Sequence, residues 1–436
     1  MNNEPAVRQS GSPETPDGRM PRGLVGLLMA FSFLSYFNRT SMSEAGAGKI
    51  IPEGILTESQ MGDIYSALLV AYTVFMLPGG WLTDRAGPRV ALIVMGLGTA
   101  FFATMTGAIG QFLVPATGLF AGLLITRALM GIFTAPIYPA SGRMVSITVP
   151  ARRRAEANGL ILGTALLGSA AAPFAFGFLM DRLNWPGTFV FMGGVTGALA
   201  LLWMFATRRR SSEISTVTSV VNDGEQYAPW WSLLRCRRVL FLTAAYAFIG
   251  YYQNLFVYWS HSYFDNVMHL DKVTGRAYTT VLYLATAFGM FSGGFLADWL
   301  GRKAGSSQAR SRLQVAISGL LGGAVFLSVG LSVSQPIWVV TSLALAWAAL
   351  GLVEGPLWAM AVESGGRRGG SAGAIFNTGG NFGGIFSPAI TPRLAAAFGW
   401  TAAVSVAVGA CLVAIVFLIL AISSKPAARS QKIGSA

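Results

Sequence analysis

Two stretches of the chain repeat one pattern: GWLTDRAGPR at residues 80–89 and GFLADWLGRK at residues 294–303. Both fit Gly-x-Leu-x-Asp-x-x-Gly-x-Arg/Lys, and each joins two apolar segments. The Asp is expected to end a helix where the glycines permit a tight turn and close packing. The basic residues could pair with it or with a neighbouring helix. We predict that these loops gate a conformational change, through Gly80, Asp84, Arg85, Arg89, Gly294, Asp298 and Arg302.

The composition outside these loops indicates a membrane protein. The chain is 53% hydrophobic and 11% charged, whereas soluble domains carry about 25% charged residues. Alternating ten-residue strand patterns are missing from the sequence, so helices rather than a barrel are expected to satisfy the backbone in hydrocarbon. The predicted fold class is an all-α polytopic membrane protein. Its twelve spans lie near 22–42, 59–82, 90–110, 118–144, 154–180, 185–206, 238–264, 275–300, 312–332, 336–361, 370–394 and 400–422.

The repeated loops lie six spans apart, which predicts two pseudo-symmetric six-helix bundles. The expected organisation is a disordered tail at 1–21, bundles at 22–206 and 238–422, a linker at 207–237 that ends in an interfacial amphipathic segment, and a second tail at 423–436. Lys and Arg give the orientation. Outer loops hold Lys49, Arg182, Lys272, Arg276 and Arg393, the spans hold Arg39 and Arg127, and the remaining 24 of the 31 basic residues are inner. Both termini are therefore predicted to be cytoplasmic, at the inner cell membrane.

The doubled loop resembles the signature of the major facilitator superfamily. The resemblance covers about residues 22–422 and implies a central cavity and alternating access. A narrower resemblance is to the anion:cation symporter branch, which includes sugar-acid importers. It is carried by Ser35-Tyr36-Phe37-Asn38-Arg39, by Tyr72 with Pro78-Gly79-Gly80, by Arg127 through Gly131 with Pro136, and by Gly373 through Gly384 with Ser387-Pro388.

Arg39 and Arg127 are the sharpest chemical features. A charge near the bilayer centre costs roughly 2.5–3.5 kcal/mol, so each must face a polar cavity or a partner. One interpretation is that each pairs with a carbonyl or carboxylate and locks helices together. The alternative, which the branch also implies, is that the guanidinium groups bind an anionic substrate in bidentate fashion.

The chain departs from the branch at two acidic positions associated with proton coupling, which are Asn38 and Thr134 here. The internal repeat suggests a replacement, because Arg127-x3-Gly131-x2-Thr134 aligns with Trp347-x3-Gly351-x2-Glu354. Glu354 is the most deeply placed acid of the predicted spans. We predict that it takes and releases the coupling proton, or else forms a structural hydrogen bond or ion pair.

Further substrate-binding residues are expected in three spans. Gln253, Asn254 and Tyr258 are polar within span seven, and in the branch this region lines the cavity. Tyr72 and Asn377 are implied by the branch match, and Asn381 either lines the cavity or bonds across helices. The glycines around Asn381 favour close helix packing over a phosphate loop.

The sequence predicts a transporter rather than an enzyme, with no cofactor and no metal. Its expected partners are a small anionic substrate, a proton or another cation, and the lipid bilayer, with no nucleic acid and as a monomer. The leading function is proton-driven import of a sugar acid or other carboxylate. The alternatives are an organophosphate:phosphate exchanger, an efflux protein of the same superfamily, and a non-transporting membrane sensor.

Overall fold

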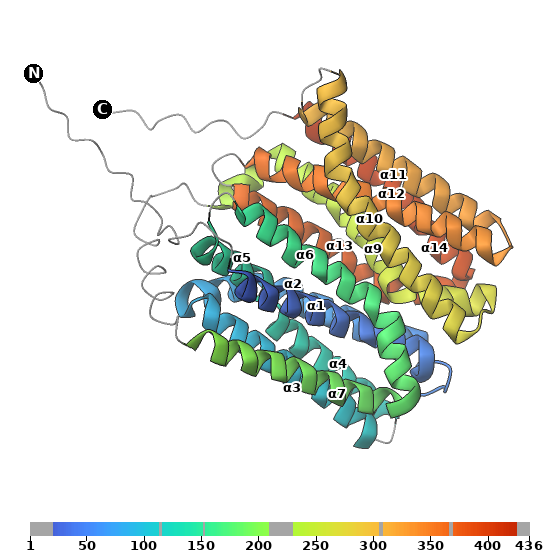
Figure 1. Ribbon diagram of the computed structural model, residues 1–436. Helices are drawn as coiled ribbons and strands as arrows, with labels where there is room; N and C mark the ends of the chain where they lie inside the picture. Colours follow the sequence, from blue (N-terminus) through green and yellow to red (C-terminus); the bar gives the residue numbers. More distant parts are fainter. Residues whose placement is uncertain are drawn as a thin grey trace, which may run out of the picture.

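The computed structural model describes residues 21–112, 116–150, 153–208, 230–304, 308–365 and 369–424, and within these ranges the regular structure is entirely helical (Figure 1). The first bundle contains α1 (Arg22–Ala45), η1 (Gly46–Ile50), α2 (Glu58–Ala86), α3 (Pro88–Phe112), α4 (Ala116–Thr134), α5 (Ile137–Thr148), α6 (Arg154–Ala171), η3 (Ala172–Phe176) and α7 (Gly177–Ala206). The second contains η5 (Trp230–Arg235), α9 (Arg237–Met268), α10 (Lys272–Ala304), α11 (Gln308–Ser332), α12 (Pro336–Ser364), α13 (Gly369–Phe398) and α14 (Trp400–Ser423).

The predicted twelve passes are present. Nine described segments are long and apolar enough to cross a membrane. One of them, Ala157–Ala206, contains two passes, because Asn184 has φ 57° and ψ 167° and turns the chain inside α7. The helices α1 and α13 complete the set. Their polar and glycine residues lower their hydropathy, as expected for helices that line a polar interior.

Prolines interrupt the passes that were predicted as continuous. Span four consists of α4 and α5, with a break at Ala135 and Pro136. Span five passes through the π-helical turn η3, which contains Pro173. A proline lacks the N–H that would continue the helical hydrogen-bond ladder, so the helix bends or breaks there.

The two bundles repeat each other in their packing as well as in their sequence. Gly131 of α4 lies so close to α2 that a Cβ would overlap the Leu68 carbonyl oxygen. Its counterpart, Gly351 of α12, lies equally close to the Thr286 carbonyl oxygen of α10. The missing side chains let these helix pairs approach closely, as small residues do in membrane proteins. The repeat read from the sequence is therefore also a repeat of helix contacts.

The repeated loops differ in their turns. Gly87 has φ +84°, which suits glycine and ends α2 as predicted. In the second copy α10 continues through Gly301 to Ala304. The expected close packing at Gly80 and Gly294 is wrong, because a Cβ on either would meet open space. Their neighbours Gly79 and Gly293 make the close approaches instead, to Pro136 and Leu352.

The basic residues of these loops make few contacts that could gate a movement. Arg85 lies over the Trp81 ring, 5.3 Å from its centroid. Arg89 donates to Thr207 and to the Met204 carbonyl, at 3.0 Å each, and so ties α3 to the end of α7. Arg302 is exposed. The side chains of Asp84 and Asp298 lie outside the described residues, so the predicted gating role stays a prediction.

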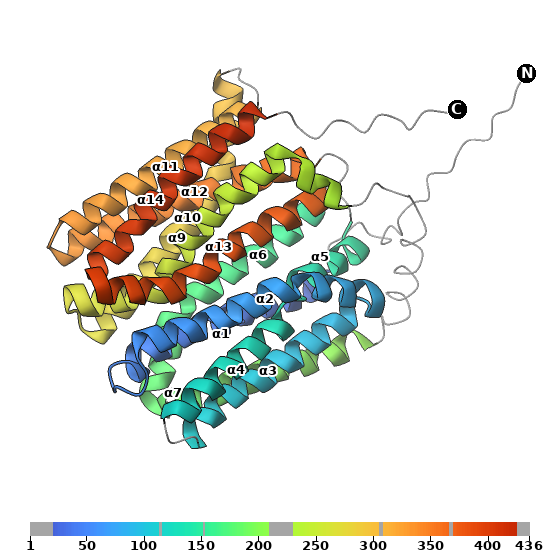
Figure 2. The same cartoon turned by 180° about the vertical axis from the view of Figure 1, so that it is seen from behind.

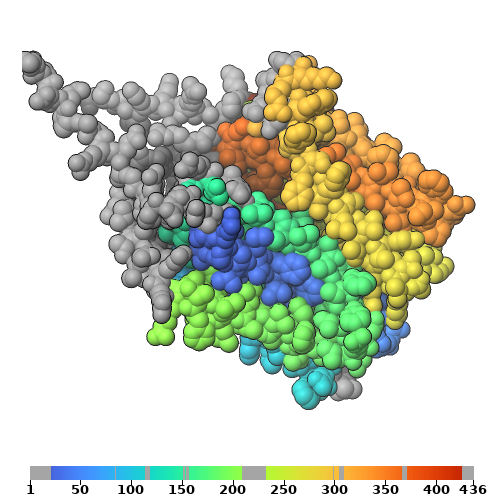
Figure 3. Space-filling view, in the orientation of Figure 1, coloured from blue at the N-terminus to red at the C-terminus, as the bar shows by residue number. Residues whose placement is uncertain are grey.

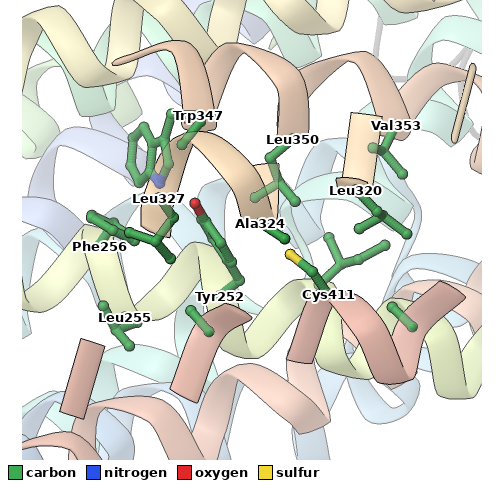
Figure 4. Close-up of a cluster of buried hydrophobic side chains, with 14 of the residues drawn as sticks. Tyr252, Leu255, Phe256, Leu320, Ala324, Leu327, Trp347, Leu350, Val353 and Cys411 are labelled. Atoms are coloured by element: carbon green, nitrogen blue, oxygen red, sulfur yellow. The ribbon is translucent and has the colours of Figure 1, made fainter. Parts of the chain in front are cut away.

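The apolar core of the second bundle lies between α9, α11, α12 and α14. Figure 4 shows part of it, with Tyr252 and Phe256 of α9 facing Trp347 and Leu350 of α12. The tails at 1–20 and 425–436 and most of the predicted linker, 209–229, lie outside the described residues. The linker's expected amphipathic end is the short 3-10 helix η5, whose Leu233 packs on Val239 and Ala372.

The bundles form two lobes that meet along α6 and α10 in Figure 3, and along α2 and α13 in Figure 2. We call the end that contains Pro21 and Ser424 the terminal end, and the end that contains the turns at residues 46–57, Asn184 and Gly399 the distal end. Among the described residues, the ion pairs between the bundles all lie at the distal end. They join Arg276 to Asp181 and Arg393 to Asp63, and at the same end His261 Nδ1 of the second bundle lies 3.3 Å from Glu44 Oε2 of the first.

Candidate functional site

A polar cavity of about 180 Å³ lies between the two bundles. Helices α1 and α6 of the first bundle and α9, α10, α12 and α13 of the second supply its walls. Its lining residues are Tyr36, Arg39, Thr40, Leu166, Ser169, Tyr246, Gln253, Asn254, Val257, Tyr283, Thr286, Met290, Trp347, Leu350, Glu354, Asn377, Gly380 and Asn381. Within this set, Arg39 is the basic residue and Glu354 the acidic one. The cavity therefore combines one guanidinium and one carboxyl with neutral amides, hydroxyls and rings.

Arg39 projects from α1 into this cavity toward the second bundle. Its Nη2 donates to Asn254 Oδ1 at 3.3 Å, and its Nε donates to the Tyr258 hydroxyl at 3.4 Å. The rings of Tyr36 and Tyr72 lie 5.5 and 5.8 Å from its Cζ, within cation–π range. No carboxylate of the described residues forms an ion pair with it. Its charge is therefore solvated by dipoles and rings and stays available to an anion.

Arg127 occupies a different environment from Arg39. It is 1% exposed and is not a cavity-lining residue. Its Nη2 donates to the carbonyls of Asn38 and Arg39, at 3.1 and 3.3 Å, and its Nη1 contacts Met130 Sδ at 3.2 Å. In this conformation the guanidinium locks α4 to α1 through carbonyls, directly behind Arg39. Its direct contact with substrate stays a prediction.

The backbone of α1 beside Arg39 carries an unusual density of side-chain donors. Ser41 donates to the Phe37 carbonyl and Ser43 to the Thr40 carbonyl, both at 2.7 Å. With the two carbonyls held by Arg127, four successive carbonyl oxygens each accept a bond from a side chain. Additional hydrogen bonds from side chains to helix carbonyls tend to bend a helix, and the π-helical turn η1 follows shortly after. The position of Arg39 is thus fixed by its own helix and by α4.

Glu354 lies on the opposite wall, on α12, and is 4% exposed. Its carboxylate accepts the Tyr246 hydroxyl at 2.9 Å and the Gln253 amide at 2.5 Å, both from α9. No described Lys, Arg or His forms an ion pair with it. A buried acid without a cation can change its protonation state without breaking a salt bridge. Its predicted structural hydrogen bond is present, and its role in proton coupling stays a prediction.

The amide side chains predicted from α9 and α13 meet in the same cavity. Asn254 accepts the Arg39 bond and donates to the Gly250 carbonyl at 2.9 Å. Asn377 and Asn381 lie one turn apart on α13, and Asn381 Nδ2 donates to the Asn377 carbonyl at 3.0 Å. Gln253 joins this group through Glu354. Together they offer donors and acceptors to the hydroxyls of a bound molecule.

Two further predicted residues lie behind the cavity wall. Tyr258 stacks on Tyr65 of α2 with ring centroids 4.8 Å apart, and only its hydroxyl reaches Arg39. The ring of Tyr72 contacts Arg39. Tyr72 and Arg39 also line a second, smaller cavity together with Tyr36 and Thr134. These residues support Arg39 rather than face the central cavity. Their contact with substrate stays a prediction.

Sequence reasoning missed several residues of this region. Tyr246, Tyr283 and Trp347 line the cavity. Trp347 could have been found from the repeat, since it aligns with Arg127 and sits in the equivalent helix. Glu44 was also missed: it is 2% exposed, at least as buried as Glu354, and lies in α1 because this helix continues to Ala45 beyond the predicted end at residue 42.

A larger groove of about 1250 Å³ lies beside the second bundle, between α9, α13 and α14. Its walls are almost entirely apolar, with Phe248, Phe382 and Val413 among them. Such a surface cannot recognise a charged metabolite. The smaller polar cavity is therefore the candidate binding site.

The family model of the Major Facilitator Superfamily matches residues 22–388. The chain belongs to this superfamily, and the predicted fold class and family are confirmed. Proteins of this family and its relatives are transporters, so the prediction that the chain is a transporter rather than an enzyme is confirmed as well.

Curated relatives come from the organic-anion branch that the sequence resembled. The probable sulfoacetate transporter SauU of Cupriavidus necator is 27% identical over 379 residues, covering 84% of this chain and 85% of the relative. The D-galactonate transporter of Escherichia coli O6:H1 is 27% identical over 390 residues, covering 85% and 88%. The chain is thus similar to transporters of small organic acids over most of its length.

The fold also matches solved structures. A bacterial homologue of the human lysosomal transporter Spinster, crystallised in an inward-facing and occupied conformation, superposes with a TM-score of 0.75. The match covers 93% of this chain and 97% of that one, at 16% identity. At this identity the likeness establishes the arrangement of helices and nothing about substrate.

Proposed function

We propose that this chain imports a small organic anion, such as a sugar acid or another carboxylate, by proton-coupled alternating access. The observation that carries the proposal is Arg39, a guanidinium in the central cavity with no carboxylate partner among the described residues. A charge at this depth is costly unless a polar group or ligand compensates it. An anion that binds there gains a charge-assisted, bidentate interaction with little competition from protein acids.

The cavity lining favours a monoanion that also carries hydroxyl groups. Arg39 supplies a single positive charge, which matches one carboxylate or sulfonate. The amides of Gln253, Asn254, Asn377 and Asn381 suit hydroxyls, and Tyr36 and Trp347 offer ring faces. The relative named as a D-galactonate transporter supports this chemistry, because galactonate is a monocarboxylate with several hydroxyls. The relative named as a probable sulfoacetate transporter supports only the wider class of small organic anions, since sulfoacetate carries two acidic groups and no hydroxyl. A dianion would bring a second charge that the described lining does not neutralise.

Glu354 is the proposed coupling site. It shares the cavity with Arg39 but is bonded only to neutral donors, Tyr246 and Gln253. In the branch that the sequence resembles, acids are expected at the positions of Asn38 and Thr134. Here both side chains form neutral hydrogen bonds within the first bundle: Asn38 donates to Thr196 at 2.9 Å, and the hydroxyls of Thr134 and Thr99 lie 3.3 Å apart. We propose that the titratable group lies in the second bundle instead, at the repeat-related position of Glu354.

Alternating access requires that one end of the inter-bundle interface opens while the other closes. The polar bonds at the distal end support a conformation closed at that end. The distribution of Lys and Arg supports a distal end outside the cell and both termini in the cytoplasm. We further propose that the protein acts as a monomer in the inner cell membrane, with the repeated loops at the terminal end as gating elements.

Uptake into proteoliposomes tests the proposal. Labelled monocarboxylates with and without hydroxyls, a sulfonate, a dicarboxylate and inorganic phosphate are offered with and without an inward proton gradient. The expected result is concentrative uptake of a hydroxylated monoanion that requires the gradient. Exchange of phosphate for an organophosphate, export against the gradient, or no transport of any anion would each contradict the proposal in favour of an alternative.

A further inference from the structure

A buried acid and a buried histidine face each other across the distal interface, outside the central cavity. Glu44 lies in the last turn of α1 in the first bundle, and His261 lies on α9 in the second. Glu44 Oε2 and His261 Nδ1 are 3.3 Å apart, and the residues are 2% and 5% exposed. The two atoms lie within ion-pair distance, and neither forms a hydrogen bond among the described residues. The other imidazole nitrogen, Nε2, lies toward Gly275 of α10, where a Cβ would be 3.6 Å away.

Other charged groups near this pair already have partners of their own. Arg276 holds Asp181, Lys49 holds Glu53, and Lys272 donates to the Gly48 carbonyl. Tyr65 of α2 and Tyr283 of α10 lie close enough to interact electrostatically with Glu44. The charged and titratable groups on the elements that meet at this end include Tyr65 and Glu58 on α2, Tyr258 and Asp265 on α9, Tyr283 and Arg276 on α10, Asp181 on α7, and Lys49, Glu53 and Lys272 in the distal turns. Arg39 and Arg127 interact with Tyr283 and Tyr65 from the cavity side.

The net charge of the pair decides how readily it can be buried. A carboxylate beside a neutral imidazole carries one negative charge, and burying an uncompensated charge is strongly unfavourable. One added proton makes the pair neutral overall, either as carboxylate with imidazolium or as carboxylic acid with imidazole. The pair observed in the closed interface is therefore expected to hold one proton between its two members.

We propose that Glu44 and His261 form a second proton-binding site, which takes up one proton from the distal solution when the distal end closes. The proposal rests on the alternating access of the proposed function, because the two residues belong to different bundles and must separate when this end opens. The proton returns to the distal solution on reopening. The site therefore regulates the opening of the distal gate and is separate from Glu354.

The sign of the pH dependence follows from the proton count. In the open state both side chains are hydrated, and water stabilises the carboxylate without a proton on its partner. The closed state therefore holds one proton more than an open state that has released it, so closing becomes less favourable as pH rises. The closing equilibrium constant is expected to fall by about tenfold per pH unit in that range.

Distance measurements between two spin labels would follow this equilibrium directly. Labels on Phe112→Cys and Ser334→Cys report from the distal ends of the two bundles, in a background of Cys236→Ser and Cys411→Ala. The purified full-length protein is measured without substrate from pH 6 to pH 8.5. The wild-type sequence in this background is expected to shift from the short to the long distance as pH rises through this range.

Two variants should change this behaviour in opposite ways. Glu44→Gln removes the charge that must be neutralised, so it is expected to stay closed with no pH dependence over this range. His261→Gln leaves a lone carboxylate, so closing should be weaker than in wild type at each pH, while the fall of about tenfold per pH unit remains. The double variant should behave like Glu44→Gln. Glu58→Gln is the matched control, because Glu58 is a distal acid that accepts a hydrogen bond from Asn266 of the other bundle. Its closing equilibrium should keep the wild-type dependence on pH.

Three results would overturn the proposal. The first is a wild-type distance distribution that does not change between pH 6.5 and pH 8.5 while substrate still shifts it, which leaves the proposed function intact. The second is an unchanged slope in Glu44→Gln. The third is the absence of a long distance in every variant at every pH, which would refute alternating access as well.

Discussion

Replacing Glu354 by Gln should separate proton coupling from substrate movement. The substitution removes the acidic function from the cavity while it keeps the size and one carbonyl oxygen of the side chain. Gln253 can still donate to that oxygen, and the Tyr246 hydroxyl can turn to accept from the new amide group. Because a neutral hydrogen bond contributes about 1 kcal/mol, the fold should lose little stability.

The size of the effect follows from the charges in the cavity. Glu354 is the acidic residue of the described lining, so one proton should move with each anion. A proton and a monoanion together carry no net charge, so the membrane potential should not contribute. A gradient of one pH unit supplies about 1.4 kcal/mol per proton, which corresponds to about tenfold accumulation. In Glu354→Gln the accumulation ratio should fall to about one.

The assay is uptake of the labelled anion into proteoliposomes under two conditions. With an inward proton gradient, wild type should concentrate the anion and Glu354→Gln should only equilibrate it. With unlabelled anion inside and no gradient, both should exchange label at similar rates. Glu363→Gln is the matched control, because it makes the same change on the same helix at an exposed carboxylate paired with Arg312.

Two outcomes would refute the reasoning. Equal loss of exchange and accumulation in Glu354→Gln would show that the residue is structural and not a coupling site. Normal gradient-driven accumulation in the variant would show that another group carries the proton.

Three further predictions concern the framework of the cavity. Arg127→Gln removes the donors to two α1 carbonyls, so anion affinity should fall by about tenfold through Arg39, less than for loss of Arg39 itself; an unchanged affinity in equilibrium binding would refute the positioning role. Gly383→Leu forces a side chain against the Ala247 carbonyl, so the protein should lose on the order of 1–3 kcal/mol of stability and melt at lower temperature, whereas Gly409→Leu, in open space, should not. Asp181→Asn breaks the distal ion pair with Arg276, so the distal end should open more often. Thiol labelling of a cysteine at the buried position Ser262 should then become faster, measured relative to an exposed cysteine at Ser334. An unchanged labelling rate would contradict a distal gate held closed by this pair.

The sequence predicted the fold well because membrane insertion leaves so few solutions. Hydropathy and the doubled loop were enough for twelve passes in two similar bundles. The break at Pro136 and the turn inside α7 at Asn184 depend on local backbone geometry and shifted only the boundaries. The packing glycines were harder to choose, because Gly79 and Gly80 are equivalent in sequence and only the helix direction distinguishes them.

The candidate site was predicted in part. Arg39, Gln253, Asn254, Glu354, Asn377 and Asn381 do meet in one cavity. For Arg127 the sequence allowed either a substrate-binding position or a contact with backbone carbonyls. Its position in a span does not reveal that the side chain points at the carbonyls of α1. Glu44 was missed because an acid at the end of an apolar run looks like a loop residue. Its partner His261 lies more than two hundred positions away, so only the fold brings them together.

Anion binding to purified protein tests the central role of Arg39 most directly. Titration calorimetry with the anion that wild type transports should show affinity reduced by about 30-fold or more in Arg39→Gln, since losing one partner of a buried charge pair costs roughly 2–5 kcal/mol. Arg39→Lys should fall between the two, because it keeps the charge and loses the planar fork. Arg85→Gln, an exposed arginine over Trp81, should bind like wild type. Wild-type affinity in Arg39→Gln would contradict the proposed recognition of an anion in this cavity.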